Sequence, residues 1–426
     1  MIKKNKKILV GLEIGTTKVS VLVGEMLPDG MINIIGIGNC PSKGIDKGSI
    51  NDLQAIIFCI KKAIQEAEKM AKYNISSVYL ALSNKYINYT NEIGIVPISK
   101  NEITQHDVKY AIYTAQSIKL NHSYHILHTI PQEYSIDQEN GIKNPIGLSG
   151  IRMKAKLHLI TCREDLKQNF IKALKICNIK IKQIIFSGLA SSEAVLTEEE
   201  KKSGVCLIDI GGGSIDIIIY INNSIQHSQV IPYAGNTITN DIAHVFNISF
   251  QNAEKIKLKY GSTMLSPLSI SKKIIEISNI HEYYIRKIQK ETLIEVIESR
   301  YEELLNIVNK NIIKIQEKLY YLKKPYLLGS GIVITGGSSQ MKYLESFAEK
   351  IFNMQVRIGN PIKITTHTDF SINPSYSTTV GLLRYGSNEQ NNYEKNINKY
   401  NIFTKYFQFF KKWIKKYSKL TYLYKN

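Results

Sequence analysis

The 426-residue chain has few cysteines, a single tryptophan and no long uninterrupted apolar run. Its five cysteines are odd in number, widely spaced and form no C-x-x-C pair, which disfavours a disulfide framework or a zinc site and favours reduced intracellular thiols. Because no apolar run is long enough to cross a bilayer, we expect no membrane-spanning helix. The first ten residues are basic but lead directly into a patterned strand, unlike a cleavable secretion signal. We therefore expect the body of the protein to be soluble and intracellular.

Acidic residues are also scarce, since 36 aspartates and glutamates accompany 55 lysines and arginines, for a formal net charge of +19. A nucleic-acid-binding protein would gather that charge in a patch or stripe with aromatic stacking partners. Here lysine is scattered along a chain that is rich in isoleucine and asparagine throughout, so we expect no nucleic-acid partner. No acidic residue follows Glu394, and basicity is concentrated only after that point.

Two distant stretches share one pattern of strand, small-residue turn and strand. The first spans residues 8–25, ILVGLEIGTTKVSVLVGE, and the second spans 205–220, VCLIDIGGGSIDIIIY. In each, a β-branched strand leads to an acidic residue, and a second β-branched strand follows the turn. This recurrence suggests an internal duplication.

The two turns carry the residue types that bind polyphosphate and magnesium. Glycine has no Cβ, so backbone N–H groups can approach a phosphate, and hydroxyl and ammonium groups add donors. A carboxylate at each strand end can hold Mg²⁺ through water. Ordinary hairpins are the alternative, but two matched turns in one chain favour phosphate binding. The candidates are Gly15, Thr16, Thr17 and Lys18 in the first turn, Asp209, Gly211, Gly212, Gly213 and Ser214 in the second, and Glu13 and Asp209 for Mg²⁺.

A third element begins at residue 331, where an apolar strand ends at Thr335. Gly336, Gly337 and Ser338 then precede apolar positions at helical spacing, so we expect them to open a helix. A Gly-Gly turn lets the backbone approach a flat base or ribose, and a helix N-terminus favours anionic groups. Such junctions are common, but in third place after two phosphate hairpins this one becomes a specific signal.

The order of these three elements resembles the superfamily of actin, Hsp70 and the sugar kinases. Within it, the chain resembles the FtsA family of bacterial cell-division proteins from about residue 8 to 386 and again in its tail. The closer likeness rests on GLEIGTTKVSVLVGE, IPQEYSIDQENGIKNPIGLSGIRMKAKLHLITC, LIDIGGGSIDI, VIPYAGN and VITGGSSQ. The resemblance implies an α/β, two-lobed actin-like ATPase fold with ATP and Mg²⁺ in the cleft.

The resemblance also implies roles for single residues. Glu254 and Lys257 match an A-E-x-I-K pattern that contacts ribose and base in related proteins, although alone they are equally an exposed helix ion pair. Relatives with clear ATPase activity tend to carry a Glu or Gln after the first connecting strand, to orient water. Here Ser187 lies near that place and Glu193 is expected on another helix face. The chain should therefore bind ATP with weak or no ATPase activity, and its catalytic residue is unknown.

A domain plan follows from the resemblance. The first lobe would hold residues 1–83, 164–190 and 362–388, and the second would hold 191–361, with a core of 191–240 and 302–361 and a subdomain of 241–301. A small α+β domain at 84–163 would be inserted as a contact surface for neighbouring subunits and other division proteins. A flexible linker at 389–401 and a membrane-targeting amphipathic helix at 402–426 would complete the chain.

Two further features of these domains have functional interpretations. His122, His125 and His128 suggest a zinc site, but no cysteine or carboxylate completes it nearby and a strand would put neighbouring histidines on opposite faces, so we interpret them as structural. Residues 291–319 are expected to form a long helix. By resemblance, its Arg300 would contact the acidic C-terminal peptide of the tubulin-like ring protein FtsZ.

The carboxy-terminal segment follows a polar, asparagine-rich stretch that is typical of a flexible linker. Its apolar residues recur at i, i+3, i+4 and i+7 beside lysines, which predicts a helix lying in an anionic membrane surface. Docking on the protein's own core, or in a calmodulin-type groove, is the alternative. The membrane candidates are Phe403, Phe407, Phe410, Trp413 and Ile414, with Lys411, Lys412, Lys415 and Lys416.

The sequence and its resemblance together predict an actin-like ATP-binding scaffold that polymerises on the cytoplasmic face of the inner membrane at the division site. It would anchor the FtsZ ring through its terminal helix and recruit later division proteins. A phosphotransferase of the same fold and a membrane-linked actin-like adaptor for pilus assembly are the alternatives.

Overall fold

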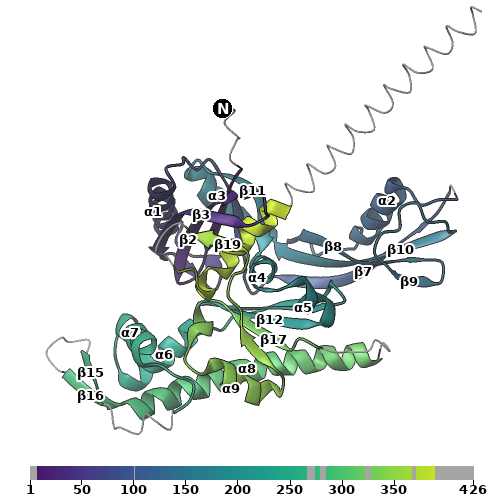
Figure 1. The fold of residues 1–426 in the computed structure, drawn as a ribbon. Coiled ribbons are helices and arrows are strands. Elements are labelled where there is room, and N and C mark those ends of the chain that lie inside the picture. The colour runs from purple at the N-terminus through teal and green to yellow at the C-terminus, as the bar shows by residue number, and fades with distance from the viewer. Residues whose placement is uncertain are drawn as a thin grey trace, which may run out of the picture.

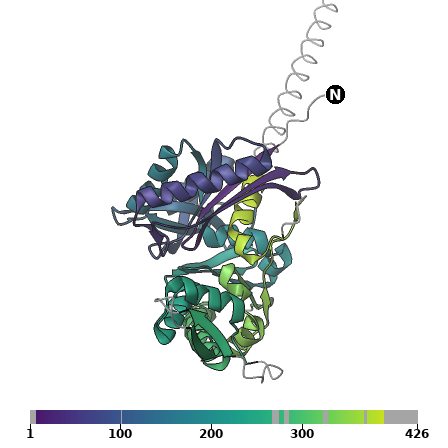
Figure 2. The ribbon, with the colours of Figure 1, turned by 90° about the vertical axis from the view of Figure 1, so that its left-hand side faces the viewer.

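The computed structural model describes residues 7–99, 101–265, 274–278, 285–321, 328–366 and 371–388 (Figure 1). The chain forms two lobes, one above the other, and a smaller inserted sheet projects to one side (Figures 1 and 2). The predicted linker at 389–401 and terminal helix at 402–426 lie outside the described residues. Within the described part, no helix combines the length and apolar content needed to cross a membrane.

The first lobe is built on a six-stranded sheet with the order β11-β6-β1-β2-β3-β19. Its central hairpin joins β1 (Ile8–Ile14) and β2 (Lys18–Met26) in antiparallel register, as the sequence predicts. The remaining strands are β3 (Ile32–Pro41), β6 (Ser77–Leu82), β11 (Lys180–Phe186) and β19 (Ile364–Thr366). Short strands β4 (Ile45–Asp46) and β5 (Ser49–Ile50) and helices α3 (Glu164–Ile176) and α4 (Ser187–Val195) complete this part of the chain.

Helix α1 (Leu53–Ala71) lies directly on this sheet because small residues allow a close approach. Asp52 caps the helix by accepting hydrogen bonds from the backbone N–H groups of Gln54 and Ala55. A Cβ added at Gly38 of β3 would lie 1.8 Å from the carbonyl oxygen of Ala63. Glycine at this position therefore sets the distance between helix and strand.

The second lobe repeats the plan of the first. Its sheet has the order β14-β13-β12-β17-β18, in which β12 (Val205–Ile210) runs antiparallel to β13 (Ile215–Ile221) and parallel to β17 (Ile332–Thr335). In the first lobe, β1 has the same relation to β2 and β6. The equal strand order and direction confirm the predicted internal duplication. The other elements are β14 (Ser224–Ile231), β15 (Ile274–Ser278), β16 (Ile285–Gln289), β18 (Val356–Ile358), α5 (Glu198–Ser203), α6 (Gly235–Phe246), α7 (Phe250–Tyr260), α8 (Lys290–Tyr321) and α9 (Leu344–Phe352).

Strand β12 shows why the second hairpin is almost continuously apolar. Its residues alternate between two buried clusters, with Val205 and Leu207 in the cluster shared with the first lobe and Cys206 and Ile208 in the core beneath. Both faces of the strand are thus covered, and a polar face is not needed. All five cysteines of the chain are free, and four of them are buried.

The helix predicted to open at the Gly-Gly turn begins later than expected. Gly336 has a φ of +91°, and residues Gly337–Gln340 form only a single 3₁₀ turn, η2. Helix α9 starts at Leu344, after Tyr343 takes a left-handed conformation. The prediction was wrong because the positive φ of Gly336 interrupts the chain between strand and helix, and apolar periodicity does not report backbone conformation.

The inserted domain is a four-stranded sheet with the order β7-β10-β8-β9. Strands β7 (Asn88–Pro97) and β8 (Tyr124–Ile136) both run antiparallel to β10 (Arg152–Arg163), which lies between them. With α2 (Gln105–Gln116) these strands form a βαβ-type unit in which β10 lies between the two parallel strands. Strand β9 (Glu139–Ile142) forms the edge of the sheet. The sheet also meets the second lobe, where His158 Nε2 lies 2.9 Å from Ser228 Oγ of β14.

His125 and His128 belong to β8, and a register shift between them pairs them with Cys162 and Ile160, which share one face of β10. The predicted opposite faces are therefore wrong, because the bulge adds a residue to the strand. His125 is exposed and lies 3.6 Å from Glu164, whereas His128 is buried and its Nε2 accepts a hydrogen bond from the backbone N–H of Phe186 at 2.9 Å. Burial lowers the pKa of His128 to about 4, so the ring is neutral and able to accept. His128 thereby attaches the insert to the first lobe, which is a structural role.

Candidate functional site

A cavity of about 490 Å³ lies between the two lobes, a size typical of ligand pockets. Both glycine turns, helix α7 and the segment after β17 contribute to its wall. The sequence-predicted residues that line it are Glu13, Gly15, Thr16, Thr17, Lys18, Asp209, Gly211, Gly212, Gly213, Ser214, Glu254, Lys257, Gly337 and Ser338. Segments up to 325 residues apart in the chain thus meet in one place.

The two turns have the same internal structure and face each other. The N–H of Gly15 donates to the carbonyl of Lys18, and the N–H of Gly211 donates to that of Ser214, both at 3.0 Å. A Cβ added at Gly213 would lie 2.4 Å from Thr16 Oγ1 of the other lobe. Glycine is therefore required here by the contact between the lobes.

Three buried carboxylates converge on this cavity. Glu13 and Asp209 come from the first strands of the two hairpins, and Asp216 of β13 lies opposite Asp209 in the strand register. Burial raises the pKa of each, that of Glu13 to about 7 although Lys18 partly opposes the shift. Within the described residues no group of three such side chains could by itself hold a metal ion. A cation bound beside them through water would favour the ionised carboxylates and lower their pKa values.

The donor set fits a hydrated magnesium ion. Glu13 Oε2 is buried and has no hydrogen-bond partner within the described residues, while Asp209 Oδ2 accepts a hydrogen bond from Ser191. Carboxylate oxygens beside an open cavity are the ligands that Mg²⁺ uses when it keeps several waters. The two glycine turns supply room for a polyphosphate on the same side.

Lys18 is the cation of the first turn, and it contacts a segment from the far end of the chain. Its Nζ lies 3.3 Å from Ser375 Oγ and 3.6 Å from the centre of the Tyr376 ring. Burial lowers the pKa of Lys18, and attraction to Glu13 partly restores it. Ser375 and Tyr376 belong to a 3₁₀ turn, η3 (Pro374–Tyr376), which precedes a final described helix at residues 377–388.

Glu254 and Lys257 of α7 form a pair at 2.7 Å beside the cavity. Lys257 Nζ also lies 2.7 Å from Thr239 Oγ1 and 3.1 Å from the carbonyl oxygen of Gly235. The side chain of Lys257 is only 7% exposed. The alternative of an exposed helix ion pair is therefore wrong, because tertiary packing covers the lysine.

Gly336 does not reach the cavity wall. A Cβ added there would lie 2.2 Å from Asp209 Oδ1 and 2.5 Å from the carbonyl oxygen of Ile210. The residue thus packs behind the second turn and supports Asp209. Ser338, two residues on, lines the cavity, and its Oγ donates to the carbonyl oxygen of Gly211 at 2.9 Å.

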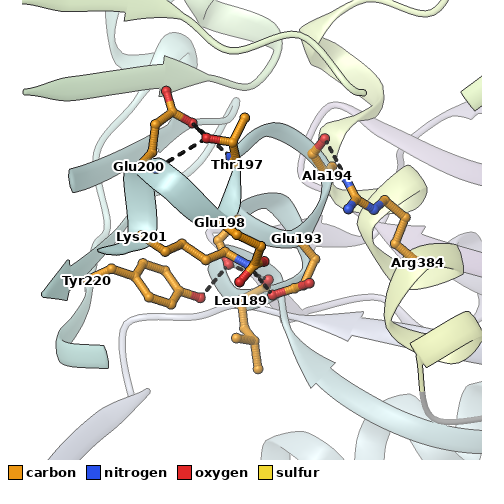
Figure 3. A network of polar contacts seen from close by, with 10 residues as sticks. Leu189, Glu193, Ala194, Thr197, Glu198, Glu200, Lys201, Tyr220 and Arg384 are labelled. Carbon is orange, nitrogen blue, oxygen red and sulfur yellow. Dashed lines mark hydrogen bonds and ion pairs between the residues drawn. The ribbon is translucent and has the colours of Figure 1, made fainter. Parts of the chain in front are cut away.

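Helix α4 presents a serine to the cavity and turns its glutamate away. Ser187 lines the cavity, whereas Glu193 pairs with the buried Lys201 at 2.8 Å (Figure 3). Both positions agree with the sequence-based expectation. Ser192 and Tyr220 join the same polar network through a hydroxyl contact of 2.8 Å.

Arg300 is already engaged within the second lobe. Its Nη2 donates to Asp241 Oδ1 at 3.0 Å, and its Nη1 contacts Glu303. These hydrogen bonds and charges raise the pKa of the guanidinium, which stays charged. The predicted contact with an acidic peptide would therefore take place beside existing carboxylate partners.

Sequence reasoning missed several cavity residues. Asp216 had a local signal, since a carboxylate within the isoleucine run of β13 has to be explained by a partner or a function. Asn236 ends the quoted stretch VIPYAGN, and Tyr301 lies in the predicted helix at 291–319, although neither was singled out. Ser83, Ser375 and Thr378 also line the cavity and come from segments with no motif of their own.

The chain is similar to known protein families and to single proteins along most of its length. A family described as "Cell division protein FtsA" matches residues 206–381, and "SHS2 domain inserted in FTSA" matches residues 84–161. Cell division protein FtsA of Buchnera aphidicola subsp. Schizaphis graminum is 54% identical over 98% of this chain and 99% of that protein. The Escherichia coli K12 protein of the same name is 51% identical over 93% of this chain and 94% of its own length.

Solved structures with low sequence identity share the fold. The PilM–PilN type IV pilus biogenesis complex has a TM-score of 0.64 at 16% identity, over 90% of this chain and 99% of that chain. MreB5 of Spiroplasma citri bound to AMPPNP has a TM-score of 0.53 at 14% identity, over 92% and 99%. The fold is thus actin-like, with an SHS2 insertion. Because more than half of the aligned residues are identical to those of relatives matched over nearly their full length, the chain belongs to the FtsA family of cell division proteins.

Proposed function

We propose that this protein is an ATP-binding scaffold that polymerises on the inner membrane, tethers the FtsZ ring and recruits later division proteins. One observation carries the nucleotide site: the glycine turns of both lobes face one cavity, together with Lys18 and three buried carboxylates. Family membership supports partners among the division proteins. The MreB5 structures with ADP and AMPPNP, which have the same fold, support an adenine nucleotide as the ligand. The domain boundaries predicted from the sequence are part of this proposal.

Each part of the nucleotide would meet a different part of the cavity. Thr16, Thr17, Lys18 and Ser214 would bind the polyphosphate, and Glu13 and Asp209 would hold Mg²⁺ through water. Mg²⁺, when bound, neutralises phosphate charge. The adenosine would lie against Glu254, Lys257, Gly337 and Ser338.

Weak or absent hydrolysis is part of the proposal. Helix α4 presents Ser187 to the cavity, where relatives with clear ATPase activity tend to present Glu or Gln, and its Glu193 is held by Lys201. ATP would then control conformation and assembly. The likeness to the pilus complex, at 16% identity, concerns the fold alone and does not favour a pilus adaptor over a division scaffold.

Magnesium-dependent ATP affinity is expected to increase from about pH 6 to about pH 8 and to depend on Glu13. Without ligand the pKa of Glu13 is raised to about 7 by burial, and water-mediated binding of Mg²⁺ needs the ionised carboxylate. Glu13→Gln should weaken the magnesium-dependent affinity about ten- to hundredfold and flatten the pH dependence. Calorimetric titration with ATP, with and without Mg²⁺, measures both effects.

The matched control for this titration is Glu345→Gln, at an exposed glutamate of α9 that is not itself among the residues lining the cavity. It should leave affinity and pH dependence unchanged. Equal affinity with and without Mg²⁺ would contradict the magnesium site. Failure of the wild-type protein to bind ATP at any of these pH values would contradict the proposed nucleotide function itself.

Membrane binding is expected to require the terminal residues. In co-sedimentation with anionic liposomes and ATP, the full chain should pellet and a chain ending at Asn401 should stay in solution. The reason is that each lysine near an anionic surface contributes about 1 kcal/mol, and several tails on a filament act together. Neutral liposomes serve as the control, and pelleting of the truncated chain would rule out the anchor.

An FtsZ C-terminal peptide added to the same assay should pellet with the full chain only. Arg300 is the proposed contact, and of its two carboxylate partners Glu303 is the more exposed, at 56% against 26% for Asp241. An acidic peptide would therefore replace Glu303 more easily than Asp241. A peptide that stays in solution with the membrane-bound protein would favour another partner.

A further inference from the structure

The first hairpin places opposite charges close together in the cavity without pairing them. Glu13 and Lys18 flank the same turn, both line the cavity, and their charges attract each other. In the part of the chain that the structure describes, however, no ion pair within 4.0 Å joins them. Glu13 Oε2 instead has no hydrogen-bond partner among the described residues, and the lysine contacts residues from another segment.

The contacts of Lys18 come from η3, 357 residues further along the chain. The ammonium lies over the Tyr376 ring, with Nζ 3.6 Å from its centre, and donates to Ser375 Oγ at 3.3 Å. An aromatic face attracts a cation through its quadrupole without supplying a charge. Lys18 is therefore held, but its positive charge is not neutralised.

Tyr376 and Ser375, which contact the lysine, are themselves held by hydrogen bonds. The hydroxyl of Tyr376 accepts a hydrogen bond from Asn39 Nδ2 at 2.9 Å, and only 7% of this residue is exposed. Ser375 Oγ donates to Asn373 Oδ1 at 2.6 Å. The ring and the hydroxyl thus keep their positions whether or not the lysine contacts them.

We propose that Tyr376, assisted by Ser375, is a positioning residue that keeps the Lys18 ammonium away from Glu13 before a ligand binds. This inference rests on the proposed nucleotide function. Paired with each other, the two groups would neutralise their charges, and a magnesium–phosphate ligand would have to separate them. Held apart, the ammonium is available to phosphate and the carboxylate to the water shell of Mg²⁺.

The test compares ATP affinities of full-chain variants by calorimetry in Mg²⁺. Tyr376→Leu, which removes the aromatic face, should weaken ATP binding about three- to thirtyfold. Tyr376→Phe keeps the ring and should restore affinity to within about threefold of the wild type, although it loses the hydrogen bond from Asn39. Melting temperatures identify any variant that does not fold.

Two further measurements separate positioning from a general structural role. In a Lys18→Ala background, Tyr376→Leu should cause no further loss of ATP affinity, because the residue acts through the lysine. Adenosine, which has no phosphate, should bind equally well to wild type and Tyr376→Leu. Three results would overturn the proposal. Tyr376→Leu could lower ATP affinity as much with Lys18→Ala as without it, or it could lower adenosine affinity as much as ATP affinity. Tyr376→Phe could also lower ATP affinity as much as Tyr376→Leu does. If wild type did not bind ATP at all, the proposed function would fail instead.

Discussion

Gly336→Ala is expected to lower the free energy of unfolding by about 2–6 kcal/mol. The residue has a φ of +91° and a ψ of 171°, a conformation that is essentially restricted to glycine and costs other residues about 1–3 kcal/mol. Its new Cβ would also lie 2.2 Å from Asp209 Oδ1 and 2.5 Å from a backbone oxygen, and overpacking of this kind costs about 1–3 kcal/mol. The backbone oxygen cannot move aside as the end of a flexible side chain can, so overpacking is not relieved. Its cost therefore adds to the cost of the backbone conformation.

Urea unfolding of the full chain measures this loss, and the next residue supplies the control. A Cβ added at Gly337 would meet no atom closer than 3.8 Å, and its φ is not in the left-handed range. Gly337→Ala should therefore change stability by no more than about 0.5 kcal/mol. Equal destabilisation by the two substitutions would show that the contact behind Asp209 is unimportant.

Lys201→Met is expected to destabilise the protein by about 3–5 kcal/mol, which is the usual cost of removing one partner of a buried ion pair. The lysine side chain is 7% exposed and its Nζ lies 2.8 Å from Glu193, which is 18% exposed (Figure 3). Burial alone would lower the pKa of Lys201, but Tyr220 and the neighbouring carboxylates raise it above its usual value. The substitution would leave Glu193 charged and unpaired at the end of α4.

Two matched variants test this explanation by urea unfolding. Glu198→Gln removes the other, 73% exposed partner of Lys201 and should cost less than about 1 kcal/mol. Glu193→Leu combined with Lys201→Met removes both buried charges and should recover much of the stability that the single change loses. A double variant as unstable as Lys201→Met alone would point to packing of the lysine stem rather than to charge.

Local patterns in the sequence were sufficient for the elements that carry the site. The alternation of β-branched residues and the glycine turns predicted both hairpins and their duplication, and apolar periodicity predicted a helix at 291–319 that the structure extends to Lys290–Tyr321. These features depend on contacts between near neighbours in the chain, so a short stretch contains all the information. Family motifs then indicated which turns would share one cavity.

Tertiary structure alone decided how distant residues complete that cavity. Asp216 becomes part of the site because it lies opposite Asp209 in the hairpin, and Tyr376 because its ring contacts Lys18, a residue of another segment. A carboxylate and a carbonyl oxygen packed against Gly336 leave no room for a side chain there, and Lys257 is buried although its helix pattern suggests exposure. Sequence determines which groups are present and their local conformation. Which groups become buried neighbours depends on how the two lobes and the final helix pack, and no local pattern records that packing.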